Sequence, residues 1–144
     1  MNQETLEQIC KDVFNKLGNS HSECVYQKAL CIELNNHDSI HTVESEKYIP
    51  VMYTCSRGYD HTIGMERIDI LARCHDGSSI LMELKAHSSG IRDNTEIRQI
   101  KKYIESLKYM NIFPSLSVIV NFPQNCKSTE VEFYYYLKVI ENNQ

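Results

Sequence analysis

The feature that most limits how this chain can fold is a pair of apolar segments from Ile68 to Ala86, joined by an Asp-Gly turn. Two apolar runs around such a turn are typical of a β-hairpin. A loop over 75–77 places Gly77 at the left-handed position that three-residue loops require. This loop fixes the register of the two strands and predicts that Asp69 pairs with Glu83.

The predicted register gives the hairpin two different faces, because alternate side chains of a strand point to opposite sides. One face carries Asp69, Glu83 and Lys85 at the open end of the hairpin. The other face is apolar throughout, and we expect it to pack on the core. Its residues are Ile68, Ile70, Ala72, Ile80, Met82 and Leu84.

The acid pair predicted at Asp69 and Glu83 has a chemistry of its own, since directly opposed Cβ atoms lie roughly 4.5–5.5 Å apart. Two carboxylates at this separation repel one another unless a proton or a cation lies between them. A hard divalent ion such as Mg²⁺ accepts oxygen ligands of this kind. An exposed sheet face with ordinary charges is the alternative, and the hairpin by itself favours neither interpretation. A two-residue loop would move Asp69 to the other face.

The remaining segments predict an α/β fold with a central mixed sheet flanked by helices. Apolar stripes indicate two N-terminal helices, one over about 5–17 and one from 20–22 to about 35. The 144 residues suffice for one core, so we expect a single domain over 1–144. Later segments predict one or two strands from Ile40 to Tyr53, a helix from Arg92 to Tyr109, a buried strand from Ser115 to Phe122 and a final strand from Val131 to Ile140.

Composition argues against several classes of protein. No apolar run approaches the ~20 residues of a membrane span, and the N-terminus lacks the features of a signal peptide. We therefore expect an intracellular protein, cytoplasmic or nuclear, without a membrane partner. The six cysteines are scattered without a Cys-x-x-Cys pair, which indicates free thiols rather than a zinc site. The net charge of −4 does not suggest a general nucleic-acid binder.

The helix predicted from Arg92 to Tyr109 carries a concentrated basic surface. We expect Arg98, Lys101 and Lys102 to meet the phosphates of a nucleic acid, and a solvated helix face is the ordinary alternative. Gln99 and Tyr103 are four residues apart on the same helix, so their side chains are neighbours.

Asp69, Glu83 and Lys85 match the signature of the PD-(D/E)XK nucleases, in which an acid precedes Glu-x-Lys on the adjacent strand by about a dozen residues. Gln99 and Tyr103 resemble the Gln-x-x-x-Tyr pair of the exonuclease-like branch of this superfamily. The resemblance covers roughly 6–123, and it implies a restriction-endonuclease-like core.

The segment that joins the two N-terminal helices resembles the GxxExxY family, a branch of the same superfamily. Glu23 and Tyr26 match the motif, while Ser20 replaces its glycine and Gly18 stands two residues earlier. Ser20 and Glu23 also have the spacing of a capping box, which gives the glutamate an ordinary structural role.

The resemblance implies a nuclease that uses Mg²⁺ or Mn²⁺ to hydrolyse phosphodiester bonds, in DNA rather than RNA. Lys85 would position the attacking water or stabilise developing charge. Gln99 and Tyr103 would bind the substrate backbone or support Lys85. The implied catalytic residues are Glu23, Asp69, Glu83, Lys85, Gln99 and Tyr103, and the implied metal ligands are Asp69, Glu83, the Leu84 carbonyl and Glu23.

Two other hypotheses belong to different classes. A nuclease-fold protein that binds nucleic acid or a protein partner without cutting is compatible with the net charge of −4 and with Ser20 in the motif. A plain α/β interaction domain predicts no effect of divalent ions on thermal stability. Small nucleases often dimerise to engage a duplex, so a homodimer is one arrangement that the sequence allows.

Overall fold

The computed structural model of the protein describes residues 1–88, 94–124 and 130–136. These residues form a sheet with the strand order β1-β2-β3-β4-β5, in which β3 and β4 are parallel and the other neighbours are antiparallel. In chain order the elements are α1 (Gln3–Leu17), α2 (Glu23–Asn35), β1 (Ile40–Thr54), β2 (Asp60–Cys74), β3 (Ser79–Lys85), α3 (Asn94–Tyr109), β4 (Leu116–Asn121) and β5 (Glu132–Tyr135).

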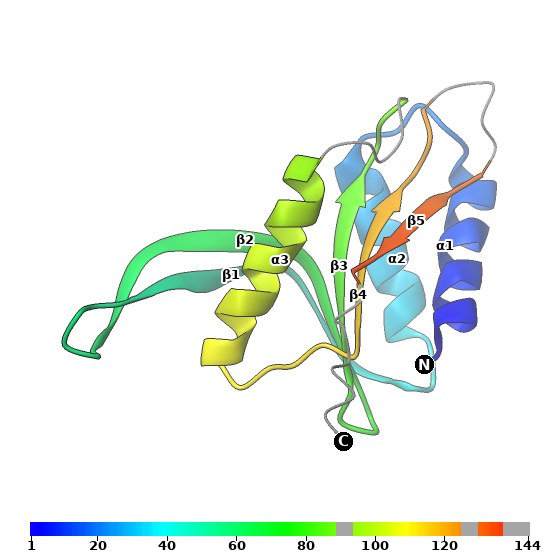
Figure 1. Cartoon of the computed structure of the whole chain (residues 1–144). Helices are drawn as coiled ribbons and strands as arrows, with labels where there is room; N and C mark the ends of the chain where they lie inside the picture. Colours follow the sequence, from blue (N-terminus) through cyan, green and yellow to red (C-terminus); the bar gives the residue numbers. More distant parts are fainter. Residues whose placement is uncertain (89–93, 125–129, 137–144) are drawn as a thin grey trace, which may run out of the picture.

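Helices cover both faces of the sheet, with α1 and α2 on one side and α3 on the other (Figure 1). On the first side, Ile70, Met82 and Leu84 pack in one core cluster with both N-terminal helices. On the second side, Leu81 and Ile119 pack in another cluster with α3. The predicted α/β fold, a mixed sheet flanked by helices, is confirmed.

The predicted hairpin register is confirmed by the pairing of β2 with β3. Arg73 pairs with Ser79, and the Cys74 N–H donates to the Ser78 carbonyl at 2.8 Å. Gly77 has a φ of 88°, which is the left-handed conformation that the three-residue loop requires. The same register, carried outward, sets Asp69 opposite Glu83.

The prediction was wrong for Ile68, which packs in the cluster on the α3 side rather than beside Ile70. The reason is the course of β2, which bends away from β3 at this level (Figure 1). Beyond the bend, β1 and β2 continue as one long two-stranded arm. Pro50 lies within that arm and pairs with Met65, so the proline does not split the predicted strand segment into two.

The second helix begins at Glu23, and its N-cap is Ser22, which makes no side-chain capping hydrogen bond. Ser20 is not the cap, because it lies in the preceding loop with a φ of 71°. The Ser20 N–H donates instead to the side chain of Gln124 at 2.8 Å. The capping-box interpretation of Glu23 is therefore wrong.

The predicted third helix is confirmed from Asn94 onward, and Arg92 lies outside the described residues. The final strand spans Glu132–Tyr135, and positions 137–140 of the predicted strand lie outside the described residues. No helix in the described part of the chain combines the length and the apolar character needed to cross a membrane.

Candidate active site

Asp69 lies where β2 leaves β3. The register between the two strands extends to the pair of Ile70 and Met82. Past this pair, the Leu84 N–H donates to the Asp69 carboxylate at 2.7 Å. The carboxylate therefore replaces the backbone carbonyl of β2 that would accept this hydrogen bond in a continuous ladder. The Lys85 carbonyl accepts from the Phe122 N–H, which follows the last residue of β4. Successive peptide groups alternate in direction, so the Leu84 carbonyl points toward β2.

Glu83 is a carboxylate held almost out of contact with water, at 3% exposure, beside Asp69 at 8%. One of its oxygens lies 3.4 Å from the Lys85 ammonium, and the other is buried without a hydrogen-bond partner. Burial, followed by the charge of Asp69, raises the pKa of Glu83 to about 8, although Lys85 opposes the shift. This acid pair therefore favours a proton or a cation between its members at neutral pH.

The two charged neighbours of Glu83 respond differently to burial. Burial raises the pKa of Asp69, against the hydrogen bond from Leu84 and the charge of Lys85. Burial alone would lower the pKa of Lys85, but the charges of Glu83 and Glu23 outweigh it, and the pKa of this ammonium is raised. Lys85 is therefore a permanent positive charge beside the acids.

Glu23 approaches the same place from the first turn of α2. Burial raises the pKa of its carboxyl, Lys85 lowers it and Asp69 raises it again. These effects require the charges of Lys85 and Asp69 to lie close to Glu23. The fold thus brings together acids that are 46 and 14 positions apart in the chain, from 23 to 69 and from 69 to 83.

Tyr26 holds the loop that precedes Glu23. Its ring is fully buried and stacks on Phe122, with 4.5 Å between the ring centroids. Its hydroxyl donates to the Gly18 carbonyl at 2.7 Å and accepts from the Gln124 side chain at 3.0 Å. The tyrosine therefore ties the start of α2 to the end of the fourth strand.

We expect Tyr26→Phe to lower the free energy of unfolding by about 1–2 kcal/mol, because two buried hydrogen bonds lose a shared partner. Urea denaturation measures the change. Tyr109→Phe is the matched control, since Tyr109 is 50% exposed and its change should lie within about 0.5 kcal/mol. Equal stability of the two variants would contradict a structural role for the Tyr26 hydroxyl.

The helix α3 presents Gln99 and Tyr103 to the acids. The Gln99 side-chain amide donates to the Tyr103 hydroxyl at 2.5 Å, as expected for neighbours four residues apart. Tyr103 is almost fully buried, and burial, followed by the charges of Glu83 and Asp69, raises the pKa of its phenol. The hydroxyl therefore stays protonated and can donate a hydrogen bond at any pH near neutrality.

Sequence reasoning missed three residues that extend this group. Asn121 is fully buried at the end of β4 and binds the main chain of His87 twice, with its side chain accepting from the N–H at 2.8 Å and donating to the carbonyl at 3.1 Å. The His87 ring lies 3.1 Å from the Glu96 carboxylate. The charge of Glu96 acts on both Glu23 and Lys85. The sequence did contain a signal for Asn121, because a polar residue at the carboxyl end of a buried parallel strand is a common position for a functional side chain.

The donors at this site suit a hard divalent ion, because they are carboxylate oxygens and a strand carbonyl. The unpartnered oxygen of Glu83 and the raised pKa of its carboxyl are both features that a cation would relieve. Among the described residues, however, no three His, Cys, Asp or Glu side chains are arranged to hold an ion by themselves. A metal here therefore needs ligands other than carboxylates to complete its shell.

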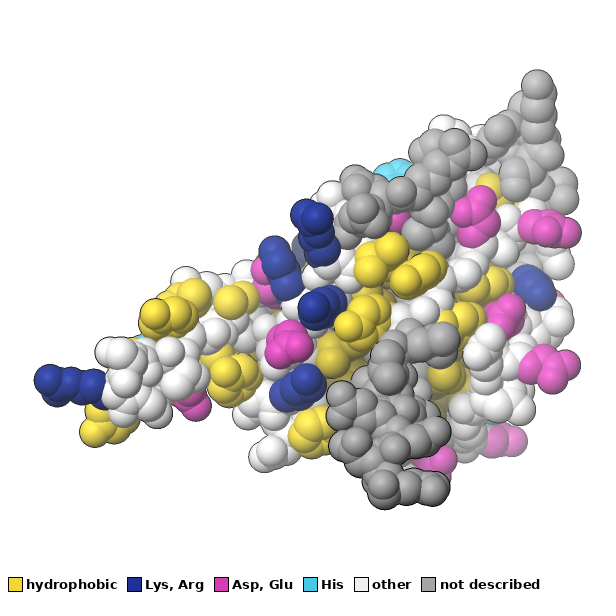
Figure 2. Space-filling view, viewed as in Figure 1, with side chains coloured by type: hydrophobic (Ala, Val, Ile, Leu, Met, Phe, Trp, Pro, Cys, Tyr) yellow, Lys and Arg dark blue, Asp and Glu magenta, His cyan; other side chains and the backbone are white. Residues whose placement is uncertain are grey.

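The predicted phosphate-binding residues Arg98, Lys101 and Lys102 are exposed on α3. Figure 2 shows Lys and Arg side chains gathered over this helix, on the face that is toward the viewer. The helix follows β3 and runs back along it, so its first turns lie at the end of the sheet that carries Lys85.

An acid pair beside a lysine, on a mixed sheet between helices, is typical of nucleases that use a metal ion. The family model of the PD-(D/E)XK nuclease superfamily matches residues 2–133, and the chain belongs to this superfamily. Its members generally use divalent metals to hydrolyse phosphodiester bonds.

A solved structure, described as the crystal structure of SSO0001, has a similar fold at 15% sequence identity and a TM-score of 0.51. The match covers 92% of this chain and 60% of that chain, so this chain spans less than two thirds of its length. A search of the curated proteins finds no match.

Proposed function

We propose that this protein is a nuclease that hydrolyses phosphodiester bonds in DNA with the help of Mg²⁺ or Mn²⁺. One observation supports the proposal most strongly: Glu83 is buried beside Asp69 with one carboxylate oxygen unpartnered and a pKa raised to about 8. Such a pair is costly without a cation. Within the superfamily we assign the chain to the GxxExxY branch, because the charges of Asp69 and Lys85 act on Glu23 and Tyr26 anchors its loop.

Asp69, Glu83 and the Leu84 carbonyl would hold the ion in this proposal, with Glu23 binding or orienting a water beside it. When bound, the ion supplies positive charge that activates water and neutralises the phosphate. Lys85 stabilises the negative charge that develops on the phosphate, and it stays charged because its pKa is raised.

Gln99 and Tyr103 complete the proposed site from the helix. The Tyr103 hydroxyl keeps its proton and can donate a hydrogen bond to a substrate oxygen, while Gln99 fixes the direction of that hydroxyl. Arg98, Lys101 and Lys102 give a charged surface for the nucleic-acid backbone next to these groups.

Metal binding is the direct test. We expect Mn²⁺ to bind the wild-type protein in isothermal titration and to raise its melting temperature by several degrees, since a ligand at 100 times its Kd stabilises by about 2.7 kcal/mol. Asp69→Asn should lose most of this effect, while Glu66→Gln, which changes another acid of the same strand, should keep it. Equal Mn²⁺ binding by wild type and Asp69→Asn would contradict the proposed ligands.

A nuclease fold that binds without cutting is the second candidate function. It is favoured by one observation, the lack of three suitably arranged acidic, His or Cys ligands among the described residues. A panel of DNA and RNA substrates separates the two functions. Salt-dependent binding without cleavage in Mg²⁺ or Mn²⁺ would support the second candidate.

A homodimer is part of the DNA proposal, because one active site cuts one strand, and two copies of the protein are needed to cut both strands of a duplex together. The arm of β1 and β2 exposes apolar side chains that suit a contact between copies, and these are Tyr48, Tyr53, Tyr59, Ile63 and Met65. We expect sedimentation to show a concentration-dependent dimer that Tyr53→Ser weakens. A monomer at all concentrations, with and without duplex, would contradict this part of the proposal.

A further inference from the structure

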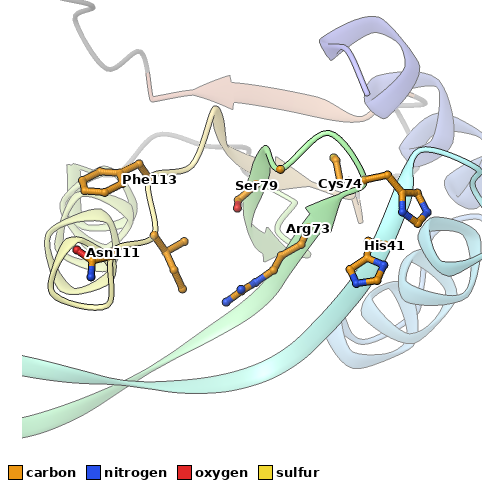
Figure 3. A pocket seen from close by; sticks show the side chains of 9 residues that line it. His41, Arg73, Cys74, Ser79, Asn111 and Phe113 are labelled. Carbon is orange, nitrogen blue, oxygen red and sulfur yellow. The ribbon is translucent and has the colours of Figure 1, made fainter.

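A hollow lies at the end of the sheet farthest from Lys85, and we call it the turn pocket (Figure 3). Its volume is about 620 Å³, and it opens between the β2–β3 turn and the segment that follows α3. None of its lining residues is acidic. The polar and aromatic side chains that line it are His41, Arg73, His75, Ser79, Asn111 and Phe113.

The chemistry of the turn pocket suits an anion with several oxygens. Figure 3 shows Arg73 and His41 extending from neighbouring strands at its wall. The Arg73 Nε atom is buried without a hydrogen-bond partner, and its ion pair with Glu44 is long, at 3.8 Å. The rings of His41 and His75 lie side by side, with 5.1 Å between their centroids. A phosphate would give the Arg73 Nε atom an acceptor, and its other oxygens could accept from the two imidazole rings.

The turn pocket shares a sheet face with the candidate active site. Ser79 and Lys85 stand at the two ends of β3, and both point to the α3 side, because alternate residues share a face. The six residue steps from Ser79 to Lys85 span about 20 Å. That length corresponds to about six nucleotides of B-form DNA. The helix α3 packs over this face between the two places, so a duplex that reaches both must cross the outer side of α3, where Arg98, Lys101 and Lys102 are exposed.

We propose that the turn pocket binds a backbone phosphate of the nucleic acid, six or more nucleotides from the bond that is cut. This inference rests on the proposed function, since it assigns part of the same substrate to a second place on the protein. The pocket acts as a second anchor, so its contribution depends on the length of the duplex.

The test measures duplex affinity by fluorescence anisotropy in EDTA, where no cleavage occurs. We expect Arg73→Gln to weaken binding of a 20-base-pair duplex about tenfold. A hairpin with a five-base-pair stem cannot reach both places, so Arg73→Gln should weaken its binding much less. Lys28→Gln makes the same change of charge on the exposed side of α2 and is the matched control.

A second variant distinguishes the loss of a phosphate contact in Arg73→Gln from a folding defect. Glu44→Gln frees the Arg73 guanidinium from its ion pair, so it should tighten binding of the long duplex, an effect that misfolding cannot produce. Glu4→Gln, on α1, controls for the change in net charge. Equal affinities of wild type, Arg73→Gln and Glu44→Gln for the long duplex would overturn the inference.

Two further outcomes separate possible failures. If no variant and no wild-type protein binds either duplex, the proposed function itself fails. NMR of the His41 and His75 rings during titration with inorganic phosphate distinguishes the source of the anion. In one outcome, phosphate changes the chemical shifts of the ring protons in a saturable way while Arg73→Gln leaves the duplex affinity unchanged. This pair of results would overturn the backbone proposal and assign the pocket to a small phosphate ester.

Discussion

Asp69→Asn is expected to lower metal-dependent cleavage of DNA by about 1,000-fold, the largest effect of any single change in this chain. The amide keeps the shape of the side chain and can still accept from the Leu84 N–H, so the strand geometry survives. What it removes is the negative charge that a cation requires. Single-turnover cleavage at saturating Mg²⁺ measures the loss, because it reports the chemical step without product release.

Lys85→Met should reduce the same rate strongly while Mn²⁺ still binds, because the ammonium is not a ligand. Glu66→Gln is the control, since Glu66 is an acid of the same strand, three residues before Asp69, and holds no ion in the proposed mechanism. Circular dichroism establishes that each variant is folded. Cleavage at the wild-type rate in both Asp69→Asn and Lys85→Met would exclude the mechanism.

The second large effect concerns stability and pH in the absence of metal. The pKa of Glu83 is raised by burial to about 8 in the folded protein, above its model-peptide range, so the folded state holds a proton that the unfolded state releases. Stability is therefore full below the unfolded pKa and is lost as the pH rises through about 8. The expected loss between pH 5 and pH 8 is on the order of 3 kcal/mol.

Urea denaturation in EDTA at several pH values measures this loss. Glu83→Gln cannot ionise, so it should flatten the pH dependence and be more stable than wild type at pH 8. Adding Mn²⁺ should restore wild-type stability at pH 8 without affecting Glu83→Gln to the same extent. A pH dependence that is the same in wild type and Glu83→Gln would show that Glu83 is ionised in the folded protein at neutral pH.

The sequence determined the parts of this protein that depend on local rules. The Asp-Gly turn predicted the register of β2 and β3 that the structure has, because a three-residue loop with glycine at 77 sets that pairing. Apolar stripes located the three helices, since a stripe at helical spacing needs a partner layer. Gln99 and Tyr103 were neighbours by helix geometry alone.

The tertiary structure decided what depends on contacts between distant segments. Both faces of β3 are buried because α3 returns over the side that carries Glu83, and this burial raises the pKa of that carboxyl. The link of Asn121 to His87 joins positions 34 residues apart, and no local pattern specifies such a pairing. Periodicity in a sequence shows which side of an element is apolar, whereas only packed layers determine how much water reaches an acid.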